Sequence, residues 1–231
     1  MGKAHSTVFM ESLMGMGATE QRAGYGLALH TTSPQLGLAL SNFQGDHKMR
    51  TWDLDRDLSS HLHVLLQEFL VPQTWSDLAF IGVAKGPGSF TGTRIGVVTA
   101  RTLAQQLKIP LFAISTLSAI AHYYKIQNPQ EFSDSERIAV QIPARRQQVF
   151  VGIYHLSATE LTADLPDTIM TETEWEETLK QLSFPYQLLK ITEEPFGETV
   201  SSVLELAYQQ WQQGKRPKME ETQPFYGQSP V

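Results

Sequence analysis

The stretch "AKGPGSFTGTRIG", residues 84–96, decides the fold class of this chain. It contains four glycines and a proline, and it joins an apolar run, "AFIGVA" at 79–84, to a helical pattern that continues to Leu107. A short apolar run bounded by glycine and proline predicts a buried strand, and the residues that follow have helical periodicity. The stretch therefore predicts a strand, a tight turn and a helix in succession, as in α/β proteins.

The glycines of this turn match neither of the common nucleotide-binding motifs. Gly86, Gly88 and Gly92 are spaced G-x-G-x-x-x-G, which differs from the dinucleotide fingerprint, and the lysine of a P-loop is missing. The free N–H groups and the dipole of the helix N-terminus would still attract an anion. One hypothesis is therefore an anion- or nucleotide-proximal loop, made of Lys85, Gly86, Gly88, Ser89, Thr91 and Arg94.

The alternative is that the small residues allow close packing. The helix carries very small side chains at every fourth position, namely Gly92, Gly96, Ala100 and Ala104. Glycine inside a helix costs up to about 1 kcal/mol relative to alanine, so Gly96 indicates a neighbour very close to the backbone. That neighbour is the chain's own sheet, the helix of residues 57–70, or another subunit, and the spacing leaves all three open.

On both sides of this stretch, strand-like runs alternate with helical patterns in an order that occurs twice. The order is three strands, a helix, a strand and a helix, and a connecting helix from Ser115 to Tyr124 follows the strand that closes the first half. The predicted strands are 25–29, 36–40, 49–54, 79–84, 111–114, 138–142, 148–154, 167–170 and 186–191, and the remaining predicted helices are 58–69, 92–107, 171–182 and 200–211.

The duplicated order predicts two similar α/β subdomains with mixed sheets, as in the actin-like ATPase and sugar-kinase (ASKHA) superfold. We expect an N-terminal subdomain at 25–114, which includes the glycine loop, and a C-terminal subdomain at 115–231. Trp175 and Trp211 lie on apolar helical faces and are expected to fill the second core.

Composition excludes several classes of function. The 231-residue chain has no cysteine, which excludes thiolate nucleophiles and cysteine-ligated metals, and its net charge of −6 disfavours direct nucleic-acid binding. The basic cluster at 215–218 is expected to be solvated surface. No run of 18 apolar residues predicts a membrane span, and a cytoplasmic location is expected. Residues 1–24 have no signal-peptide pattern and are expected to be a poorly ordered leader.

The segment "GPGSFTGTRIG" at 86–96 resembles the signature of the bacterial TsaB family, which belongs to the YeaZ-like, M22 glycoprotease-like proteins of tRNA threonylcarbamoyladenosine biosynthesis. The similarity runs from about Tyr25 to Tyr226 and includes "LALHTTSPQLGLAL", "IPARRQQVFVGIY" and the closing "QPFYGQSP". The resemblance implies an actin-like fold and a subunit that has no chemistry of its own. It implies pairing with TsaD, the threonylcarbamoyl transferase, and with the ATPase TsaE.

The resemblance also implies a homodimer of the isolated chain and tRNA contact only through the complex. The family pairs through its first two helices, so the expected interface here is Leu58, Leu62, Leu65, Phe69, Gly92, Gly96, Ala100 and Ala104. If this stripe faces outward, Gly96→Arg or Ala100→Arg would abolish pairing and leave the monomer folded. No cofactor is expected on the chain alone, although ATP or ADP with magnesium is a candidate at the junction with a partner.

One departure from the family pattern concerns catalysis. Family members usually have Asp-Thr-[AS] where this chain has His30-Thr31-Thr32, and in related phosphotransferases that acid organises a metal and the attacking water. His30 is expected to be a buried, hydrogen-bonded residue, and no catalytic or metal-binding residue is predicted; His61 and His63 are two apart and make poor co-ligands. The rival interpretation is an active ATP-dependent phosphotransferase of the sugar-kinase class.

Overall fold

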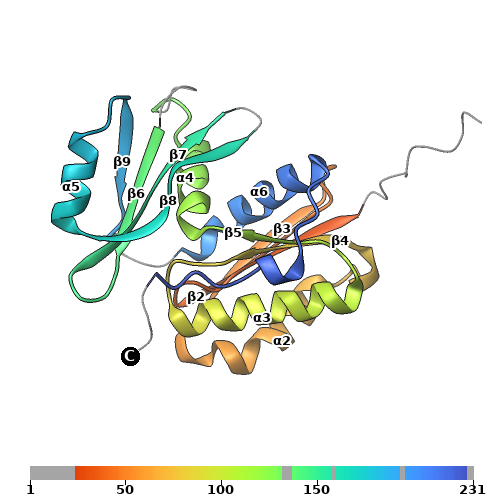
Figure 1. The fold of residues 1–231 in the computed structure, drawn as a ribbon. Coiled ribbons are helices and arrows are strands. Elements are labelled where there is room, and N and C mark those ends of the chain that lie inside the picture. The colour runs from red at the N-terminus through yellow and green to blue at the C-terminus, as the bar shows by residue number, and fades with distance from the viewer. Residues whose placement is uncertain (1–23, 132–136, 158–159, 193–195, 228–231) are drawn as a thin grey trace, which may run out of the picture.

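The computed structural model describes residues 24–131, 137–157, 160–192 and 196–227. The leader expected at residues 1–24 lies outside this part of the chain, apart from Gly24. The described residues form two lobes, each built on one mixed sheet, with helices between the lobes and on their outer faces (Figure 1). This arrangement confirms the predicted actin-like α/β fold.

The first lobe contains a five-stranded sheet in the order β3-β2-β1-β4-β5. Neighbouring strands are antiparallel from β3 to β1 and parallel from β1 to β5, so Leu29 pairs with Leu38 on one side and Val83 on the other. The strands are β1 (Tyr25–His30), β2 (Gln35–Ser41), β3 (His47–Asp53), β4 (Leu78–Ala84) and β5 (Leu111–Ile114).

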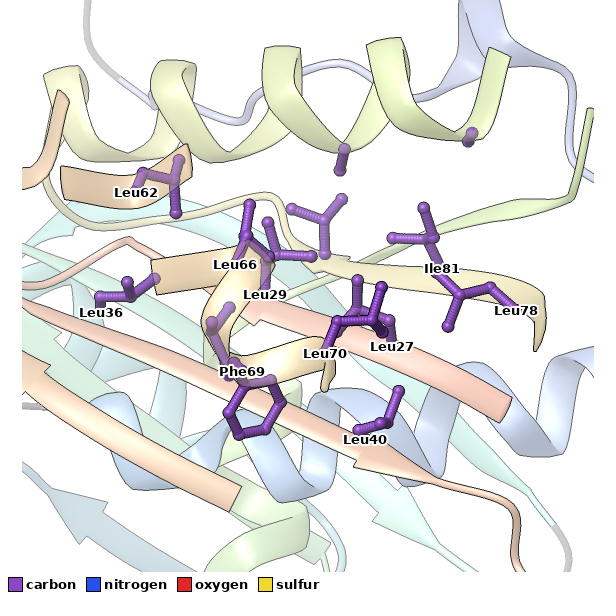
Figure 2. Packing of buried hydrophobic residues seen from close by; sticks show 14 of the residues in the cluster. Leu27, Leu29, Leu36, Leu40, Leu62, Leu66, Phe69, Leu70, Leu78 and Ile81 are labelled. Atoms are coloured by element: carbon purple, nitrogen blue, oxygen red, sulfur yellow. The ribbon is translucent and has the colours of Figure 1, made fainter. Parts of the chain in front are cut away.

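Two helices cover one face of this sheet, α2 (Leu58–Leu70) and α3 (Phe90–Leu107). Alternate residues of β1, Leu27 and Leu29, point into the core beneath α2, where Leu62, Leu66 and Phe69 meet them (Figure 2). Short 3-10 helices precede α2 and β4, at Asp55–Asp57 and Trp75–Asp77. The predicted amphipathic helix of 58–69 is thus confirmed as a core-covering helix.

The second lobe contains a four-stranded sheet in the order β8-β7-β6-β9, with β6 and β9 parallel and the other pairs antiparallel. Helix α4 lies against one face and α5 against the other (Figure 1). The elements are α4 (Thr116–Gln127), β6 (Arg137–Pro143), β7 (Gln148–Leu156), β8 (Leu161–Thr171), α5 (Glu172–Lys180) and β9 (Tyr186–Lys190). The capping box predicted at Thr171 and Glu174 begins α5.

The last helix, α6 (Val200–Gln212), returns to the first lobe and covers the second face of its sheet. A side chain at Gly82 of β4 would come within 2.9 Å of Ala207 Cβ, so the helix approaches the strand closely. Trp211 stacks on Phe80, with ring centroids 5.3 Å apart, so its predicted place in the second core is wrong, whereas Trp175 is buried there as expected. Periodicity identifies an apolar helix face but does not identify the sheet it covers.

Candidate functional site

The glycine loop between β4 and α3 lies where the two lobes and the end of the chain meet. The Gly86–Pro87 peptide bond is cis. Gly86 and Gly88 have φ values of 99° and 151°, which residues other than glycine rarely adopt. The Ser89 backbone N–H donates to Thr32 O at 2.6 Å, and Ser89 Oγ accepts from Gly92 N at 3.2 Å. Ser89 is therefore the N-cap of α3.

Close packing against the β1–β2 turn accounts for the glycines of the loop and of α3. A Cβ atom added at Gly88 would collide with Thr32 O, and one at Gly92 with Thr31 O. At Gly96 the collision would be with Thr31 Oγ1, which donates to Gly92 O at 2.8 Å. Of the three neighbours left open by the spacing, the structure thus identifies the chain's own first sheet.

The β1–β2 turn itself is buried, and its hydroxyl groups are hydrogen-bonded within the protein, whereas His30 Nδ1 has no partner among the described residues. His30, Thr31 and Thr32 have no exposed surface, and Thr32 Oγ1 lies 3.0 Å from Thr116 Oγ1 of α4 and 3.4 Å from His30 Nε2. Burial lowers the pKa of His30 to about 3, so the ring is neutral at pH 7. Ser33 Oγ accepts from Phe196 N at 3.2 Å. The prediction that His30 is a buried, hydrogen-bonded residue is confirmed.

The end of the chain packs on the glycine loop. Phe225 N donates to Lys85 O at 2.7 Å, and a side chain at Gly86 would collide with Phe225 O. The ring of Tyr226 lies 4.5 Å from that of Phe90, at the start of α3. The six residues of the proposed anion site therefore differ in exposure to solvent. Gly86 is buried and Lys85 and Gly88 are half-buried, whereas Ser89, Thr91 and Arg94 are exposed on the first turn of α3.

The predicted partner-interface residues are mostly inside the protein. Seven of the eight are buried beneath α2 and α3, and only Leu65 is half-buried. These residues pack on the chain's own sheet and on the β1–β2 turn, so within this chain the stripe faces the core, and its role in pairing stays a prediction. The seven buried residues are Leu58, Leu62, Phe69, Gly92, Gly96, Ala100 and Ala104.

The outer faces of these two helices present different residues. On α2 the exposed line contains Ser60, Val64 and Gln67, and on α3 it contains Thr91, Arg94, Val98 and Thr102. Val64 and Val98 are 53% and 57% exposed, with the exposed Glu68 one turn after Val64 and the exposed Arg94 one turn before Val98.

A buried carboxylate at the junction of the lobes was missed by sequence reasoning. Asp167 Oδ1 accepts hydrogen bonds from Tyr154 Oη and, at 2.8 Å, from Ser115 Oγ, the N-cap of α4. Burial raises the pKa of Asp167, which these two hydrogen bonds and the nearby Lys85 oppose, and Oδ2 has no hydrogen-bond partner among the described residues. The irregular register of β7 and β8 at 165–168 directs this side chain inward, and Pro166 was its only sequence signal.

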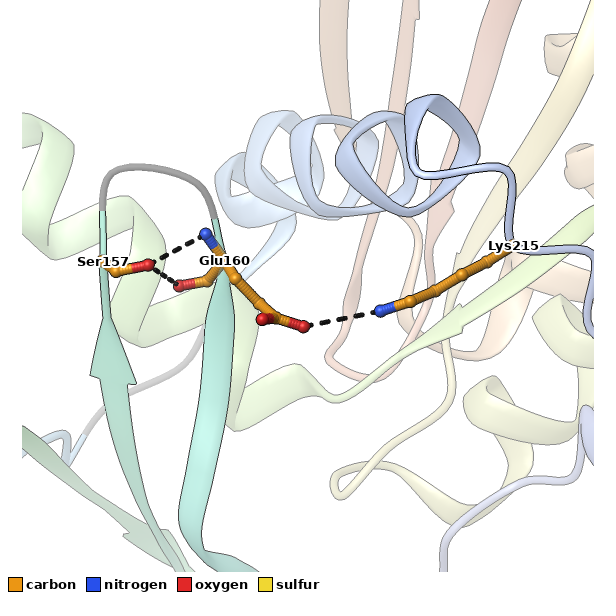
Figure 3. A network of polar contacts seen from close by, with 3 residues as sticks. All are labelled: Ser157, Glu160 and Lys215. Carbon is orange, nitrogen blue, oxygen red and sulfur yellow. Dashed lines mark hydrogen bonds and ion pairs between the residues drawn. The ribbon is translucent and has the colours of Figure 1, made fainter.

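A second contact between the lobes lies at the surface (Figure 3). Lys215 Nζ, which follows α6, is 3.5 Å from Glu160 Oε1, immediately before β8. Ser157 Oγ donates to Glu160 O at 3.0 Å and accepts from Glu160 N at 3.1 Å, which holds the end of this hairpin. Both charged side chains are half exposed, so the ion pair contributes about 0–1 kcal/mol. The basic cluster at 215–218 thus has one intramolecular acidic partner.

The two histidines considered as metal ligands, His61 and His63, are exposed on α2, apart from the junction. Asp77, just before β4, caps the turn at Thr74, whose N–H donates to Asp77 Oδ2 at 2.7 Å. The described residues contain no group of three or more His, Cys, Asp or Glu that could hold a metal ion. None of the helices in the described part is long and apolar enough to cross a membrane.

Comparison with known proteins gives consistent matches. A family model described as "TsaD: tRNA N6-adenosine threonylcarbamoyltransferase" matches residues 55–205. The tRNA threonylcarbamoyladenosine biosynthesis protein TsaB of Bacillus subtilis is 34% identical over 175 residues, which are 71% of this chain and 69% of that protein. The protein of the same name from Escherichia coli is 28% identical over 144 residues, which are 58% of this chain and 60% of that protein.

Solved structures agree on the fold. YeaZ from Pseudomonas aeruginosa superimposes with a TM-score of 0.68 at 22% sequence identity, over 88% of this chain and 99% of that chain. An uncharacterised Pseudomonas aeruginosa protein with similarity to peptidase YeaZ gives a TM-score of 0.70 at 22% identity, over 89% of this chain and all of the other. At this level of identity the likeness supports the two-lobed architecture rather than a particular activity.

Proposed function

The chain belongs to the TsaB family of tRNA threonylcarbamoyladenosine biosynthesis proteins, and from this premise we propose that it is a noncatalytic scaffold and activator subunit. It pairs with a TsaD-like transferase and a TsaE-like protein, which transfer the threonylcarbamoyl group to the adenosine beside the anticodon. The chain forms a homodimer when alone, reaches tRNA only through the complex, and works in the cytoplasm. Any ATP or ADP, with magnesium, is bound at the junction with a partner.

The residues of the β1–β2 turn support the proposal that this chain does not catalyse a reaction by itself. A phosphotransferase of this fold needs a carboxylate there to organise metal and water. This chain has a neutral, fully buried His30 at that place, and the hydroxyls of the following threonines bond to Gly92 O and Thr116 Oγ1. The turn supports the glycine loop and α4, which makes it a structural element of the scaffold.

The outer faces of α2 and α3 are the surface we assign to the partner. Val64 and Val98 are exposed at the middle of each helix, with Glu68 and Arg94 as charged neighbours one turn away. The buried stripe beneath them contributes indirectly, because its small residues hold α3 close to the sheet and so fix the position of the outer face. An exposed apolar side chain on each of the two helices could lie at the centre of a protein–protein contact, where charged residues are depleted.

The test is a titration of the chain into a TsaD-like subunit, measured by isothermal titration calorimetry. Val98→Glu and Val64→Glu should each weaken binding at least about tenfold, because a carboxylate would be buried without a partner in the interface. Ile126→Glu is the matched control, since Ile126 is 54% exposed on α4, away from these helices, and should leave affinity unchanged. Unchanged affinity for both valine variants would refute this interface.

The rival function, an ATP-dependent phosphotransferase, has one observation in its favour. Asp167 is a buried carboxylate with a raised pKa at the junction of the lobes, near Lys85, and such groups occur often at catalytic sites. ATP hydrolysis by the chain alone that is lost in Asp167→Asn would establish this rival. Equal, background-level hydrolysis by both proteins would leave Asp167 as a structural link between β8 and α4.

A further inference from the structure

An open hollow lies on the second lobe, on the face of the sheet that α5 covers only in part. It encloses about 710 Å³, within the size range of small-molecule sites. Its walls are the β6–β7 turn, the first residues of α5 and the end of β9, and no residue of the first lobe lines it. The hollow is therefore separate from the junction between the lobes.

The floor of the hollow contains a glutamine, Gln141, whose side-chain amide is open to a ligand. Gln141 is 6% exposed, and it lies on the α5 face because Val151, directly opposite on β7, belongs to the core beneath α5. Within the described part of the chain, no hydrogen bond reaches the Gln141 side-chain amide. The amide atoms of Gln141 remain accessible from the hollow, so they can exchange hydrogen bonds with solvent for hydrogen bonds with a ligand.

Two cationic side chains line the same hollow as this amide. Lys190 pairs in register with Gln141 on the adjacent strand β9, and its Nζ lies 3.8 Å from Glu172 Oε1, with both side chains more than half exposed. Arg146 lines the opposite wall, at the tip of the β6–β7 turn. Arg146 and Gln147 have φ values of 59° and 56°, an uncommon conformation for two successive residues with side chains. The turn thus holds Arg146 at the hollow at a cost in backbone strain.

The groups around the hollow are mostly hydrogen-bond donors. Besides the two cations they include glutamine amides and threonine hydroxyls, with Glu172 as the single carboxylate, and no aromatic side chain is among the lining residues. A donor-rich wall favours an oxyanion, and an arginine fork suits phosphate. The Gln141 amide needs both a donor and an acceptor from the ligand, as a sugar hydroxyl provides. Without an aromatic side chain, stacking of a base would contribute little.

We propose that this hollow binds a phosphorylated sugar, with the phosphate between Arg146 and Lys190 and a hydroxyl group on the Gln141 amide. The site is independent of the proposed scaffold role, because it lies on the second lobe, away from α2 and α3. The ligand class is defined by one phosphate and neighbouring hydroxyls, which free sugar phosphates and the phosphoribosyl part of nucleotides share.

The test is calorimetric titration of the full chain with ribose 5-phosphate, with inorganic phosphate as the second probe. Saturable binding is expected, tighter for ribose 5-phosphate than for phosphate. Arg146→Gly should weaken binding at least about tenfold, because it removes the charged fork from a turn that glycine adopts more easily. Gln141→Leu should also weaken binding, because it removes the amide that bonds the sugar hydroxyl, and its urea midpoint is measured to show that the variant is folded.

Arg56→Ala is the charge-matched control, because Arg56 is exposed on the first lobe and should leave binding unchanged. Three results would overturn the proposal: no saturable binding of ribose 5-phosphate, binding of phosphate as tight as that of ribose 5-phosphate, or full affinity in Gln141→Leu. Adenosine monophosphate in a further titration separates the two sources. If adenosine monophosphate binds more tightly than ribose 5-phosphate, the ligand is a nucleotide. If it binds equally or more weakly, the ligand is a free sugar phosphate.

Discussion

Replacing Gly96 by alanine tests whether the small-residue stripe of α3 serves the fold or faces a partner. Considered as an isolated helix position, the change should stabilise the protein by about 1 kcal/mol, because alanine has the higher helix propensity. In the structure the new Cβ would overlap Thr31 Oγ1 and lie 3.2 Å from Thr31 Cβ. Thr31 is fully buried and cannot move into solvent.

Three contributions set the magnitude for Gly96→Ala. Overpacking a buried contact costs about 1–3 kcal/mol, and loss of the Thr31 hydrogen bond to Gly92 O costs about 1 kcal/mol. The propensity gain of about 1 kcal/mol opposes both, so the free energy of unfolding should fall by about 1–3 kcal/mol. In a Thr31→Ala background the overlap with Oγ1 disappears, so the two changes should be coupled by at least about 1 kcal/mol.

The assay is urea unfolding of the two single variants and the double variant, with Thr102→Ala on the exposed side of α3 as the control. The control should not lower the free energy of unfolding, since Thr102 is exposed and the gain in helix propensity is at most about 0.7 kcal/mol. A Gly96→Ala protein that is more stable than the parent, with additive behaviour toward Thr31→Ala, would refute the close approach. The stripe would then be free to face a partner, as the sequence alone suggested.

Two further predictions concern the stability of the second lobe and of the turn. Thr171→Ala should lower the free energy of unfolding by about 1 kcal/mol in urea denaturation, because Thr171 Oγ1 caps α5 by accepting from Glu174 N at 3.2 Å. Stability should also fall below pH 6.5, because burial lowers the pKa of His30 from 6.5 to about 3, and protons therefore bind the unfolded chain more strongly over that range. His30→Gln should reduce this slope, measured as the urea midpoint against pH. An unchanged slope would show that His30 is not the source of the pH dependence.

The order of elements was predictable because each carries a local signal. The apolar spacing of 58–69, the N-cap Ser115 and the capping box of Thr171 all lie where the sequence placed them. The long strand β8 was predicted only at its end, near 167–170, because it lies at the edge of its sheet and its first half is mostly exposed. The return of α6 to the first sheet depends on tertiary packing at Gly82 and Ala207, which no local pattern expresses.

The candidate site was less predictable, because its contacts join residues that are distant in sequence. The spacing of Gly92 and Gly96 showed that something approaches α3 closely, but only the structure identifies Thr31, some 60 residues earlier, as that neighbour. The link between Asp167 and Ser115 spans a similar separation. The sequence did not show that the apolar stripe of the two correctly predicted helices faces the chain's own core, since such a stripe has the same pattern whether it meets a core or another protein.

The measurement that tests the central claim most directly is size-exclusion chromatography with light scattering, combined with an ATP hydrolysis assay. The chain is run alone and mixed with a TsaD-like subunit, in each case with and without ATP and magnesium. The scaffold account predicts a dimer that exchanges into a heteromer and hydrolyses no ATP by itself. A monomer that ignores the partner and hydrolyses ATP would contradict the account and support the phosphotransferase.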